Sequence, residues 1–569
     1  MARIRHIEIK NFRCIQQLAW VPSAGINCLI GPGDAGKSSI LDAIDFCLGA
    51  RRSLTFTDAD FYRLNVTNPI VITATVGELD DDLKSMETYG TYLRSFNAAT
   101  GVVEDEPEAQ AETVLSVRLS VGSDLDPVWT LVSDRAETAG QSRFLTWADR
   151  AQLAPNRVGG LADHNLAWRR GSVLNRLSDE RPEMAAALAD AARNARATFG
   201  DLADAQLGGT LRIVEATAQS LGIIIGEGLK AMLDTHSVSF SGGTIALHGA
   251  DGVPLRALGI GSTRLLLAGL QRQAAQKATV VLIDELEHGL EPHRILRLLT
   301  SIGAKDAAPP LQAFITSHSP VAIRELRGDQ LFVVRNIGGR HEARTVGTAD
   351  DVQGTIRLYP EAFLAPSIVV CEGASEVGLL RGMDLYRSAL GEQSITAAGI
   401  AWVDAKGIAQ VYGRASAFQR LGYRVAVLRD DDVQPEAAEE AAFLANGGAV
   451  FKWRDGCALE DEMFRCLSDA AVGSLLERAV ELLDADLVDD HIRSASNGQH
   501  TFAACRVGLS LQTRETLGKA ARSKKGSWFK SVTRMEEAAR DIVFPNLATA
   551  DEIFRNTISD IKQWIFRGA

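Results

Sequence analysis

Two pairs of carboxylates in the second half of the chain could together bind a divalent cation. Glu372 and Glu376 follow one apolar stretch, and Asp430 and Asp432 follow another. If both stretches are strands, the acids meet at one sheet edge, where they raise each other's pKa unless a cation neutralises them. With one or two Mg²⁺ or Mn²⁺ ions, such a site could activate water and stabilise the leaving oxygen of a phosphodiester. Helix capping alone also favours acids at such positions, and Asp431 between the second pair leaves the register of the Asp-x-Asp open.

A glycine-rich segment near the N-terminus has the residues of a phosphate-binding loop. The sequence GPGDAGKS fits the P-loop pattern, in which backbone N–H groups and the start of the next helix hold phosphates. Lys37 would reach the β- and γ-phosphates, and the hydroxyl of Ser38 would bind Mg²⁺. An ordinary turn is the competing interpretation. The predicted nucleotide ligands of this segment are Gly31, Gly33, Asp34, Gly36, Lys37, Ser38 and Ser39.

A second segment offers the acids that ATP hydrolysis requires. The apolar run at 280–283 leads into Asp284 and Glu285, which suits a buried parallel strand that presents acids at its carboxyl end. Asp284 would bind Mg²⁺ through water, and Glu285 would orient or deprotonate the attacking water. The competing interpretation is a strand followed by a helix start, which favours acids for electrostatic reasons.

The order of these motifs resembles that of ABC ATPases. Another apolar strand pattern ends at His318, which is by itself more often a structural histidine. In this order the resemblance implies that His318 senses the γ-phosphate and that Gly261 and Ser262 lie in the signature loop. A Ser N-cap before a helix at 263–271 would give the required anion-binding geometry. In that family the signature of one subunit completes the nucleotide site of another, which implies a homodimer or a higher homo-oligomer.

The acidic motifs resemble the Toprim domain of topoisomerases, primases and OLD nucleases. Glu-Gly-x-x-Glu begins at Glu372, and Asp-x-Asp begins at Asp430. An ABC ATPase that precedes a Toprim domain in one chain is the arrangement of the OLD (overcoming lysogenisation defect) family of ATP-dependent endonucleases. The nuclease subunit of the Gabija antiphage system is similar in length and in the order of its parts.

The resemblance implies roles for individual residues. Glu372 would bind metal or act as a base, and Glu376, Asp430 and Asp432 would be metal ligands. Glu460 lies in a further acidic motif and would be an additional ligand. The family also uses a late lysine to steady phosphate charge, for which Lys530 is the first choice and Lys525 the second, with a surface lysine as the alternative for each. The implied cofactors are ATP and Mg²⁺, with Mn²⁺ or Ca²⁺ as alternatives at the Toprim site.

Composition sets limits on the kind of protein. The chain has 569 residues, of which 46% are hydrophobic and 23% charged, as in ordinary globular proteins of several domains. A net charge of -12 argues against a protein that coats DNA nonspecifically, although a basic run at 519–534 could be a local DNA site or a solvated helix face. The absence of a long apolar run and of a Cys-x-x-Cys pair predicts a cytoplasmic protein with no membrane segment and with reduced cysteines.

The elements that must position these residues predict an α/β fold. Alternating or apolar strand patterns at 4–9 and 25–30, followed by a helix at 38–48, frame the P-loop. Residues 67–135 are β-rich, and the composition changes to a helical pattern at about 160–235. The predicted architecture is an ABC-type P-loop ATPase with an inserted helical dimerisation arm, a Toprim α/β domain and a C-terminal helical region. The predicted boundaries are 1–159 (ATPase, first part), 160–236 (helical insert), 237–363 (ATPase, second part) and 364–569 (Toprim and helical region).

The function predicted from these motifs is a metal-dependent DNA endonuclease that nicks or cleaves double strands. An ATP-binding ABC domain would regulate it, in phage defence or in DNA processing, and a helicase-like partner is compatible with this. The alternative is a noncatalytic, ATP-gated DNA-binding or recruitment protein of the RecF and SMC-like branch. The residues Asn11-Phe12-Arg13 resemble the N-terminal sequence motif of that branch.

Overall fold

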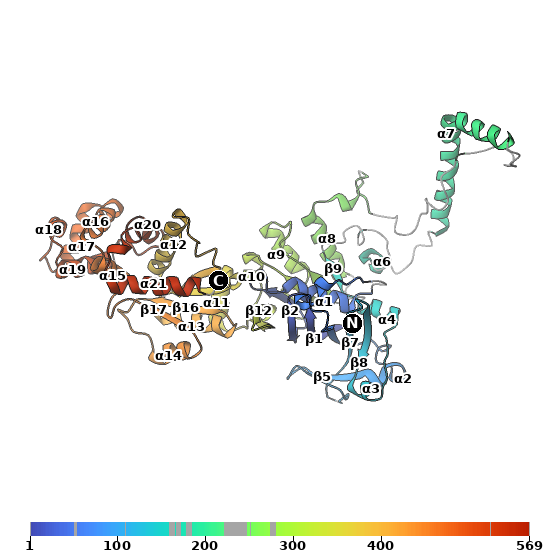
Figure 1. Cartoon of the computed structure of the whole chain (residues 1–569), viewed down its shortest axis with the longest axis horizontal. Coiled ribbons are helices and arrows are strands. Elements are labelled where there is room, and N and C mark those ends of the chain that lie inside the picture. The colour runs from blue at the N-terminus through green and yellow to red at the C-terminus, as the bar shows by residue number, and fades with distance from the viewer. Residues whose placement is uncertain are drawn as a thin grey trace. The chain divides into compact units, whose positions relative to one another are not determined.

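The chain forms two compact units (Figure 1). The first comprises Met1–Asn27 and Ser38–Ser317, and the second comprises Cys28–Lys37 and His318–Ala569. The domain boundaries predicted at 159, 236 and 363 stay predictions. The computed structural model describes residues 2–50, 54–108, 110–158, 166, 172–177, 185–220, 231, 247–250, 252–273, 280–523 and 525–567.

An antiparallel sheet makes up much of the first unit. Its strands follow the order β6-β5-β7-β4-β1-β2, and β8 also pairs with β7. Along β1, Ile7 and Ile9 are buried, and His6 and Glu8 alternate with them on the other face of the sheet. The β-rich character predicted for residues 67–135 is confirmed. The strands are β1 (Arg3–Phe12), β2 (Ile15–Trp20), β4 (Ile70–Gly77), β5 (Leu93–Asn97), β6 (Val102–Glu104), β7 (Glu112–Val121) and β8 (Pro127–Val132).

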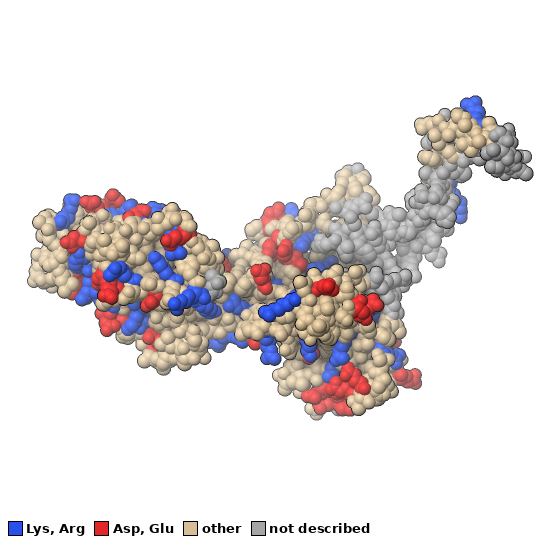
Figure 2. All heavy atoms as spheres, in the orientation of Figure 1, with Lys and Arg blue, Asp and Glu red and all other residues tan. Residues whose placement is uncertain are grey.

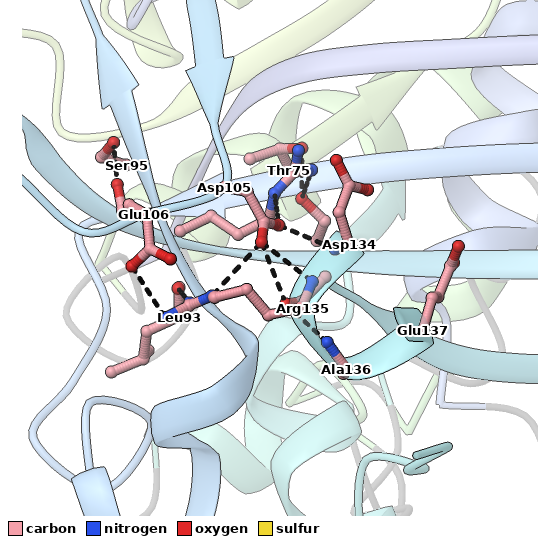
Figure 3. Close-up of polar contacts among 12 residues, drawn as sticks. Thr75, Leu93, Ser95, Asp105, Glu106, Asp134, Arg135, Ala136 and Glu137 are labelled. Atoms are coloured by element: carbon pink, nitrogen blue, oxygen red, sulfur yellow. Dashed lines mark hydrogen bonds and ion pairs between the residues drawn. The ribbon is translucent and has the colours of Figure 1, made fainter. Parts of the chain in front are cut away.

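A short helix, α3 (Asp134–Thr138), is fastened to this sheet by charge-assisted hydrogen bonds (Figure 3). The carboxylate of Asp105 accepts from the backbone N–H groups of Asp134 at 2.8 Å and Arg135 at 3.0 Å. A carboxylate at a helix N-terminus is stabilised by the helix dipole. The Arg135 side chain in turn donates to the carbonyl oxygen of Leu93 on β5 at 2.6 Å. The contact therefore fixes the β5–β6 hairpin against α3.

A parallel group of strands in the first unit carries polar residues at its carboxyl ends. Strand β10 (Val280–Ile283) pairs in parallel with β11 (Gln312–Thr316) and with β9 (Asn156–Val158). Every residue of β10 and β11 is buried, as expected of strands covered on both faces. The two apolar strands predicted from the sequence in this region are thus confirmed.

The remaining helices before residue 318 include the one predicted after the glycine-rich turn, which begins one residue earlier than expected. They are α1 (Lys37–Leu48), α2 (Met86–Tyr89), α4 (Trp147–Leu153), α6 (Val173–Leu177), α7 (Ala185–Ser220), α8 (Ile260–Gln273) and α9 (Pro292–Ser301). Helix α7 lies within the predicted helical insert 160–236 and confirms its helical character. The flanking segments 178–184 and 221–230 lie outside the described residues. Dimerisation through the insert stays a prediction.

The second unit contains a parallel sheet of four strands in the order β15-β14-β16-β17. The central strands β14 (Ser367–Cys371) and β16 (Arg424–Arg429) are almost wholly buried, and Figure 1 shows helices on both sides of the sheet. Elsewhere in the unit, β3 (Ile26–Ile30) pairs in parallel with β12, which pairs antiparallel with β13. The remaining strands are β12 (Leu331–Ile337), β13 (Arg340–Thr345), β15 (Ile400–Asp404) and β17 (Ala449–Lys452).

Helices account for most of the rest of this unit. Gly378 and Gly382 lie one turn apart on α12, and a Cβ at either position would come within 2.7 Å of atoms at Val532–Ala539. Only glycine therefore permits the close approach of α12 and α20. The helices are α10 (Pro320–Glu325), α11 (Asp350–Leu358), α12 (Ala374–Ala389), α13 (Ile408–Arg420), α14 (Ala437–Ala445), α15 (Leu459–Cys466), α16 (Asp469–Leu483), α17 (Ala485–Ala495), α18 (Phe502–Val507), α19 (Leu511–Ala521), α20 (Val532–Ala538) and α21 (Glu552–Phe566).

The surface carries both signs of charge. On the face drawn in Figure 2, acidic side chains gather at the end of the first unit that holds β5 and α3, whereas Lys and Arg are interspersed with Asp and Glu on the second unit. The seven cysteines are all free thiols, and six of them are buried, as the sequence predicted for reduced core residues. Within the described part of the chain, no helix combines the length and apolar character needed to cross a membrane.

Candidate functional site

The glycine-rich segment forms a turn between β3 and α1, as its sequence predicts. Gly31 adopts a φ of 128°, and a Cβ there would lie 2.7 Å from the carbonyl oxygen of Val334, so the position requires glycine. Lys37 is buried, and its Nζ donates to the carbonyl oxygens of Gly31 at 3.0 Å and Pro32 at 2.6 Å. Since the following residues begin α1, the turn has the strand, loop and helix order of a phosphate-binding site.

Ser38 and Asp284 are brought together although 246 residues separate them. The Ser38 hydroxyl donates to Asp284 Oδ1 at 2.9 Å, and the Thr316 hydroxyl donates to the same oxygen at 2.6 Å. The other carboxylate oxygen accepts from Arg157 at 3.2 Å. A hydroxyl and a carboxylate in contact are oxygen ligands of the kind that Mg²⁺ prefers. Sequence reasoning missed Thr316 and Arg157. The position of Thr316 at the end of a buried strand could have indicated that it belongs to the site.

Glu285 follows Asp284 on a turn that one buried arginine holds. Glu285 has a left-handed φ of 47° and a side chain 62% exposed, with the imidazole of His288 3.7 Å from its carboxylate. The Arg264 guanidinium donates to the carbonyl oxygens of Asp284 at 3.0 Å, Glu285 at 2.7 Å and His288 at 3.1 Å. Burial lowers the pKa of Arg264, while the nearby carboxylates raise it. Arg264 therefore positions the turn that presents Glu285, a role that sequence reasoning missed.

The predicted signature loop differs from expectation. Helix α8 begins at Ile260, so Gly261 and Ser262 lie in its first turn, and the prediction of a Ser N-cap before a helix at 263–271 is wrong. The Ser262 hydroxyl accepts from Arg294 at 3.0 Å. A Cβ at Gly261 would lie 2.4 Å from the carbonyl oxygen of Gly289, so the helix starts early because this glycine packs directly against a neighbouring turn.

The other predicted nucleotide ligands are placed as follows. Gly33 and Asp34 are exposed on the outside of the turn, and Gly36 has a left-handed φ of 83° just before α1. Ser39 is half-buried, with its hydroxyl 3.7 Å from the thiol of Cys14. His318 is exposed, two residues after the end of β11.

The carboxylates of the second unit converge at the carboxyl end of its parallel sheet. Glu372 Oε2 accepts from the backbone N–H of Asp430 at 3.1 Å, which joins the ends of β14 and β16. Asp430 Oδ1 accepts from the backbone N–H of Leu459 at 2.9 Å, and Glu460 Oε1 accepts from the hydroxyl of Ser375 at 3.0 Å. Glu376 follows Ser375 on α12, and its charge interacts with those of Glu460 and Glu372. We term Glu372, Glu376, Asp430 and Glu460 the acidic cluster.

Burial and mutual repulsion shift the protonation of the acidic cluster. Burial, followed by the charges of Glu460 and Glu372, raises the pKa of Glu376 to about 8. Burial, followed by the charges of Glu376, Glu460 and Glu372, raises the pKa of Asp430 to about 10. Burial also raises the pKa of Glu372 and of Glu460, which the ammonium of Lys530 partly opposes in both cases. Four carboxylates are thus held together where their charges are strongly disfavoured.

One carboxylate oxygen of the acidic cluster has no hydrogen-bond partner. Glu376 is 2% exposed, and its Oε2 accepts from the backbone N–H of Gly373 at 2.9 Å in a helix cap. Its Oε1 is buried without a hydrogen-bond partner, so capping does not account for the whole carboxylate. Among the described residues, a different group, Glu462, Cys466 and Asp551, brings three ligand atoms within 4.8 Å of one another. Arg454 already bridges the two carboxylates of that group. The acidic cluster is more widely spaced.

Two predicted residues, Asp432 and Lys530, lie at the margin of the acidic cluster. Asp432 pairs with Arg522 at 2.7 Å, and its charge raises the pKa of Glu372. Asp431 instead accepts from Arg429 and Lys452, both at 3.1 Å, so Asp430 and Asp432 are the residues of the Asp-x-Asp that face the cluster. Both lysines are exposed. The Lys530 ammonium acts on Glu372 and Glu460, whereas Lys525 contacts His491 through its backbone carbonyl. The geometry favours Lys530 over Lys525.

A protein family model matches the part of the chain that contains the glycine-rich turn. A family model described as "AAA domain, putative AbiEii toxin, Type IV TA system" matches residues 26–324, which is more than half of the chain. The chain belongs to this AAA-domain family. The matched range contains the turn at Gly31, the helix α1 and the strand ends at Asp284 and Thr316. The chain thus has an ATP-binding domain of the AAA type.

Individual relatives match the chain over short stretches. RecF, the DNA replication and repair protein of Chlorobium luteolum, is 40% identical over 67 residues, which cover 10% of this chain and 18% of RecF. The OLD nuclease of Thermus scotoductus is 35% identical over 74 residues, which cover 12% of this chain and 14% of that nuclease. The chain thus spans less than a fifth of the length of these curated relatives. Among solved structures, the Smc head domain with a coiled coil and joint derived from Pyrococcus yayanosii covers 63% of this chain and 99% of its own, at 11% identity and a TM-score of 0.35.

Replacing Arg264 with leucine is expected to destabilise the AAA domain. The change removes three charge-assisted hydrogen bonds and leaves three partly buried carbonyl oxygens without this donor, which we expect to lower the free energy of unfolding by about 2–4 kcal/mol. Urea denaturation measures the change. Arg272→Leu on the same helix is the matched control, because its ion pair with Asp306 is partly exposed and is worth about 1 kcal/mol or less. Equal losses in both variants would contradict the assigned role of Arg264.

Proposed function

We propose that the chain is a metal-dependent DNA endonuclease of the OLD type, in which a Toprim-like site cleaves phosphodiesters and the AAA domain regulates it. The acidic cluster is the observation that carries the proposal. Its four carboxylates, of which those of Glu376 and Glu460 are buried and those of Glu372 and Asp430 partly buried, repel one another, and Glu376 Oε1 is buried without a partner. Uncompensated charge of this kind is costly unless a cation or a proton neutralises it. We also propose that the second unit is similar to the Toprim domain, and that the chain is similar to the Gabija nuclease subunit.

Each residue of the cluster has a proposed role. Glu376, Asp430 and Glu460 would hold Mg²⁺ or Mn²⁺, with Ca²⁺ as a nonproductive substitute, and binding would draw these carboxylates inward. A bound ion would supply Lewis acidity for water activation. Glu372 is less buried and has a raised pKa, which suits a ligand that also accepts a proton from water. Asp432 would be a further metal ligand at the margin of the acidic cluster.

A lysine beside the acidic cluster and the ATP site of the AAA domain complete the proposed mechanism. The Lys530 ammonium, close to Glu372 and Glu460, would stabilise the charge of the scissile phosphate, and Lys525 is the less favoured choice. In the AAA domain, Lys37 would bind the phosphates of ATP, while Ser38 and Asp284 would hold its Mg²⁺ and Glu285 would orient water.

ATP is proposed to link two copies of the chain. The nucleotide ligands would extend from Gly31 to Ser39 on one copy, with His318 as the γ-phosphate sensor. Gly261 and Ser262, at the amino end of α8, would contact the nucleotide from a second copy. The proposed assembly is a homodimer or a larger homo-oligomer acting on DNA in phage defence or DNA processing, with a helicase-like protein as a compatible partner.

A second candidate function is a noncatalytic, ATP-gated DNA-binding protein. The matches to proteins named RecF favour it, and the match to a protein named OLD nuclease favours the endonuclease. Supercoiled plasmid incubated with the protein and Mg²⁺ or Mn²⁺, with and without ATP, separates the two. The endonuclease converts the plasmid to nicked or linear forms only when the cation is present. A plasmid that stays intact with every cation, while the protein still retards its migration, would overturn the endonuclease in favour of the binding protein.

Divalent cations are expected to stabilise the protein more at pH 8 than at pH 5. A carboxyl whose folded pKa is raised contributes stability that is present below its ordinary pKa of about 4 and is lost as pH rises. For Glu376 and Asp430 this window extends to about 8 and about 10. Because Mg²⁺ replaces the protons, thermal unfolding should shift upward on its addition at pH 8 and much less at pH 5. An equal shift at both values would contradict a cation in the acidic cluster.

A further inference from the structure

A cavity of about 680 Å³ runs along β15, the edge strand of the four-stranded sheet, and the proposed function does not use it. Its volume lies within the range of about 300–1,000 Å³ typical of small-ligand sites. Trp402 and Tyr359, both half-buried, contribute aromatic surface to its wall, and Pro366 lies beside them. Arg381 and Lys406 bring positive charge to the same cavity, and Glu361 and Asp404 bring negative charge. Arg381 pairs with Glu536 and Lys406 with Asp404, so a phosphate would have to compete with these carboxylates.

Lys406 is held at the cavity in an unusual backbone conformation. Its φ is 66°, in the left-handed region that non-glycine residues rarely occupy. The carboxylate of Asp404 fixes it there, because it accepts from the Lys406 backbone N–H at 2.8 Å and from the ammonium at 2.5 Å. The Lys406 side chain is 64% exposed. Backbone strain of this kind persists where the surroundings impose it, often at ligand sites.

The cavity adjoins the acidic cluster through two elements. Helix α12 carries Glu376 of the cluster and, directly after it, Val377, which lines the cavity. On the other side, the backbone N–H of Gly407 donates to the carbonyl oxygen of Glu372 at 2.8 Å, which places Lys406 next to the strand end that bears Glu372. The wall of the cavity and the acidic cluster thus share helix α12 and the strand end at Glu372.

We propose that this cavity receives the base of an unpaired nucleotide in the DNA that the acidic cluster cleaves. The proposal rests on the proposed function and names its substrate class. Aromatic side chains bind single-stranded nucleic acid by stacking on its bases, which a fully paired duplex keeps inside its own stack. The base would lie against Trp402 and Tyr359, and the phosphate would face Lys406. Substrates with a bulge, a flap or a single-stranded region are thus preferred over continuous duplex.

Fluorescence of 2-aminopurine tests the proposal without cleavage. The probe is placed either at a single-nucleotide bulge or in a matched duplex of the same sequence, and the protein is titrated in Ca²⁺. We expect quenching and tighter binding for the bulge only. Trp402→Leu, which keeps apolar volume, should weaken bulge binding about tenfold, since one stacked base contributes about 1–3 kcal/mol. Lys406→Gly should also weaken it and should fold well, because glycine suits the left-handed backbone.

Controls separate the alternatives. Asp455→Asn alters a carboxylate that is 95% exposed and should leave bulge binding unchanged. Free 2-aminopurine nucleoside monophosphate, titrated into Lys37→Met protein to silence the P-loop, tests a small-molecule ligand. Binding of the free nucleotide with no preference for the bulged DNA would overturn the proposal in favour of that ligand. Equal affinity for bulge and duplex, or no effect of Trp402→Leu and Lys406→Gly, would also overturn it. Cation-dependent plasmid cleavage that persists alongside such a result would leave the proposed function standing.

Discussion

Replacing Glu372 with glutamine is expected to slow cation-dependent plasmid cleavage by about 10²–10⁴-fold. Glutamine keeps nearly the same volume and can still accept the hydrogen bond from the Asp430 backbone, so the strand ends stay joined. It loses the negative charge that binds the cation and the oxygen that accepts a proton. ATP hydrolysis should stay unchanged, because the proposed ATP and Mg²⁺ ligands Lys37, Ser38 and Asp284 are not part of the acidic cluster.

The control for this substitution is Asp455→Asn, which removes a carboxylate of the same unit from the exposed surface. Cleavage by this variant should match that of the unaltered protein. A Glu372→Gln protein that still cleaves plasmid at the original rate would exclude the acidic cluster as the hydrolytic centre. Thermal unfolding of the two variants without cation adds a second readout, since removing one of several mutually repelling charges should raise the stability of Glu372→Gln at pH 8.

Replacing Lys37 with methionine is expected to reduce ATP hydrolysis by about 10²–10³-fold, the usual cost of losing one preorganised donor to a developing charge. Methionine keeps an apolar stem in the buried position, whereas the ammonium and its contacts with the Gly31 and Pro32 carbonyl oxygens are lost. Phosphate release under saturating ATP measures the effect. Lys10→Met, at an exposed position on β1, is the matched control and should hydrolyse ATP normally. A normal rate in Lys37→Met would show that the glycine-rich turn does not hold the hydrolysed nucleotide.

The parts of the two sites that the sequence could predict are those built from adjacent residues. A strand, a glycine turn and a helix at 26–48 form a complete local unit, and their order is visible without tertiary information. The same is true of buried strands that end at Asp284 and at Glu372, because a parallel strand reads as an apolar run and presents its next residues at one edge. The register of Asp430 and Asp432, which Asp431 leaves open in the sequence, is decided only by the contacts of Asp431 with Arg429 and Lys452.

What the sequence could not predict depends on contacts between distant segments. Arg264 lies within an apolar helix, and nothing local shows that it binds three carbonyl oxygens of another turn. Thr316 and Arg157 reach Asp284 only through strand pairing. The early start of α8 results from the packing of Gly261 against Gly289, which overrides the capping preference of Ser262. The local preference of a residue for a helix end decides where the helix begins only when tertiary contacts do not override it.

The four members of the acidic cluster come from three separated stretches of polypeptide, at 372–376, at 430 and at 460. Each of these stretches contributes at most two carboxylates to the cluster. One stretch alone therefore lacks the set of ligands that a cation site requires. During translation the acidic cluster therefore cannot assemble before residue 460 has left the ribosome and α15 has docked. If the cluster is the nuclease centre that we propose, a partly synthesised chain would be unable to attack the nucleic acid around it, and activity would appear only with the finished fold of the second unit.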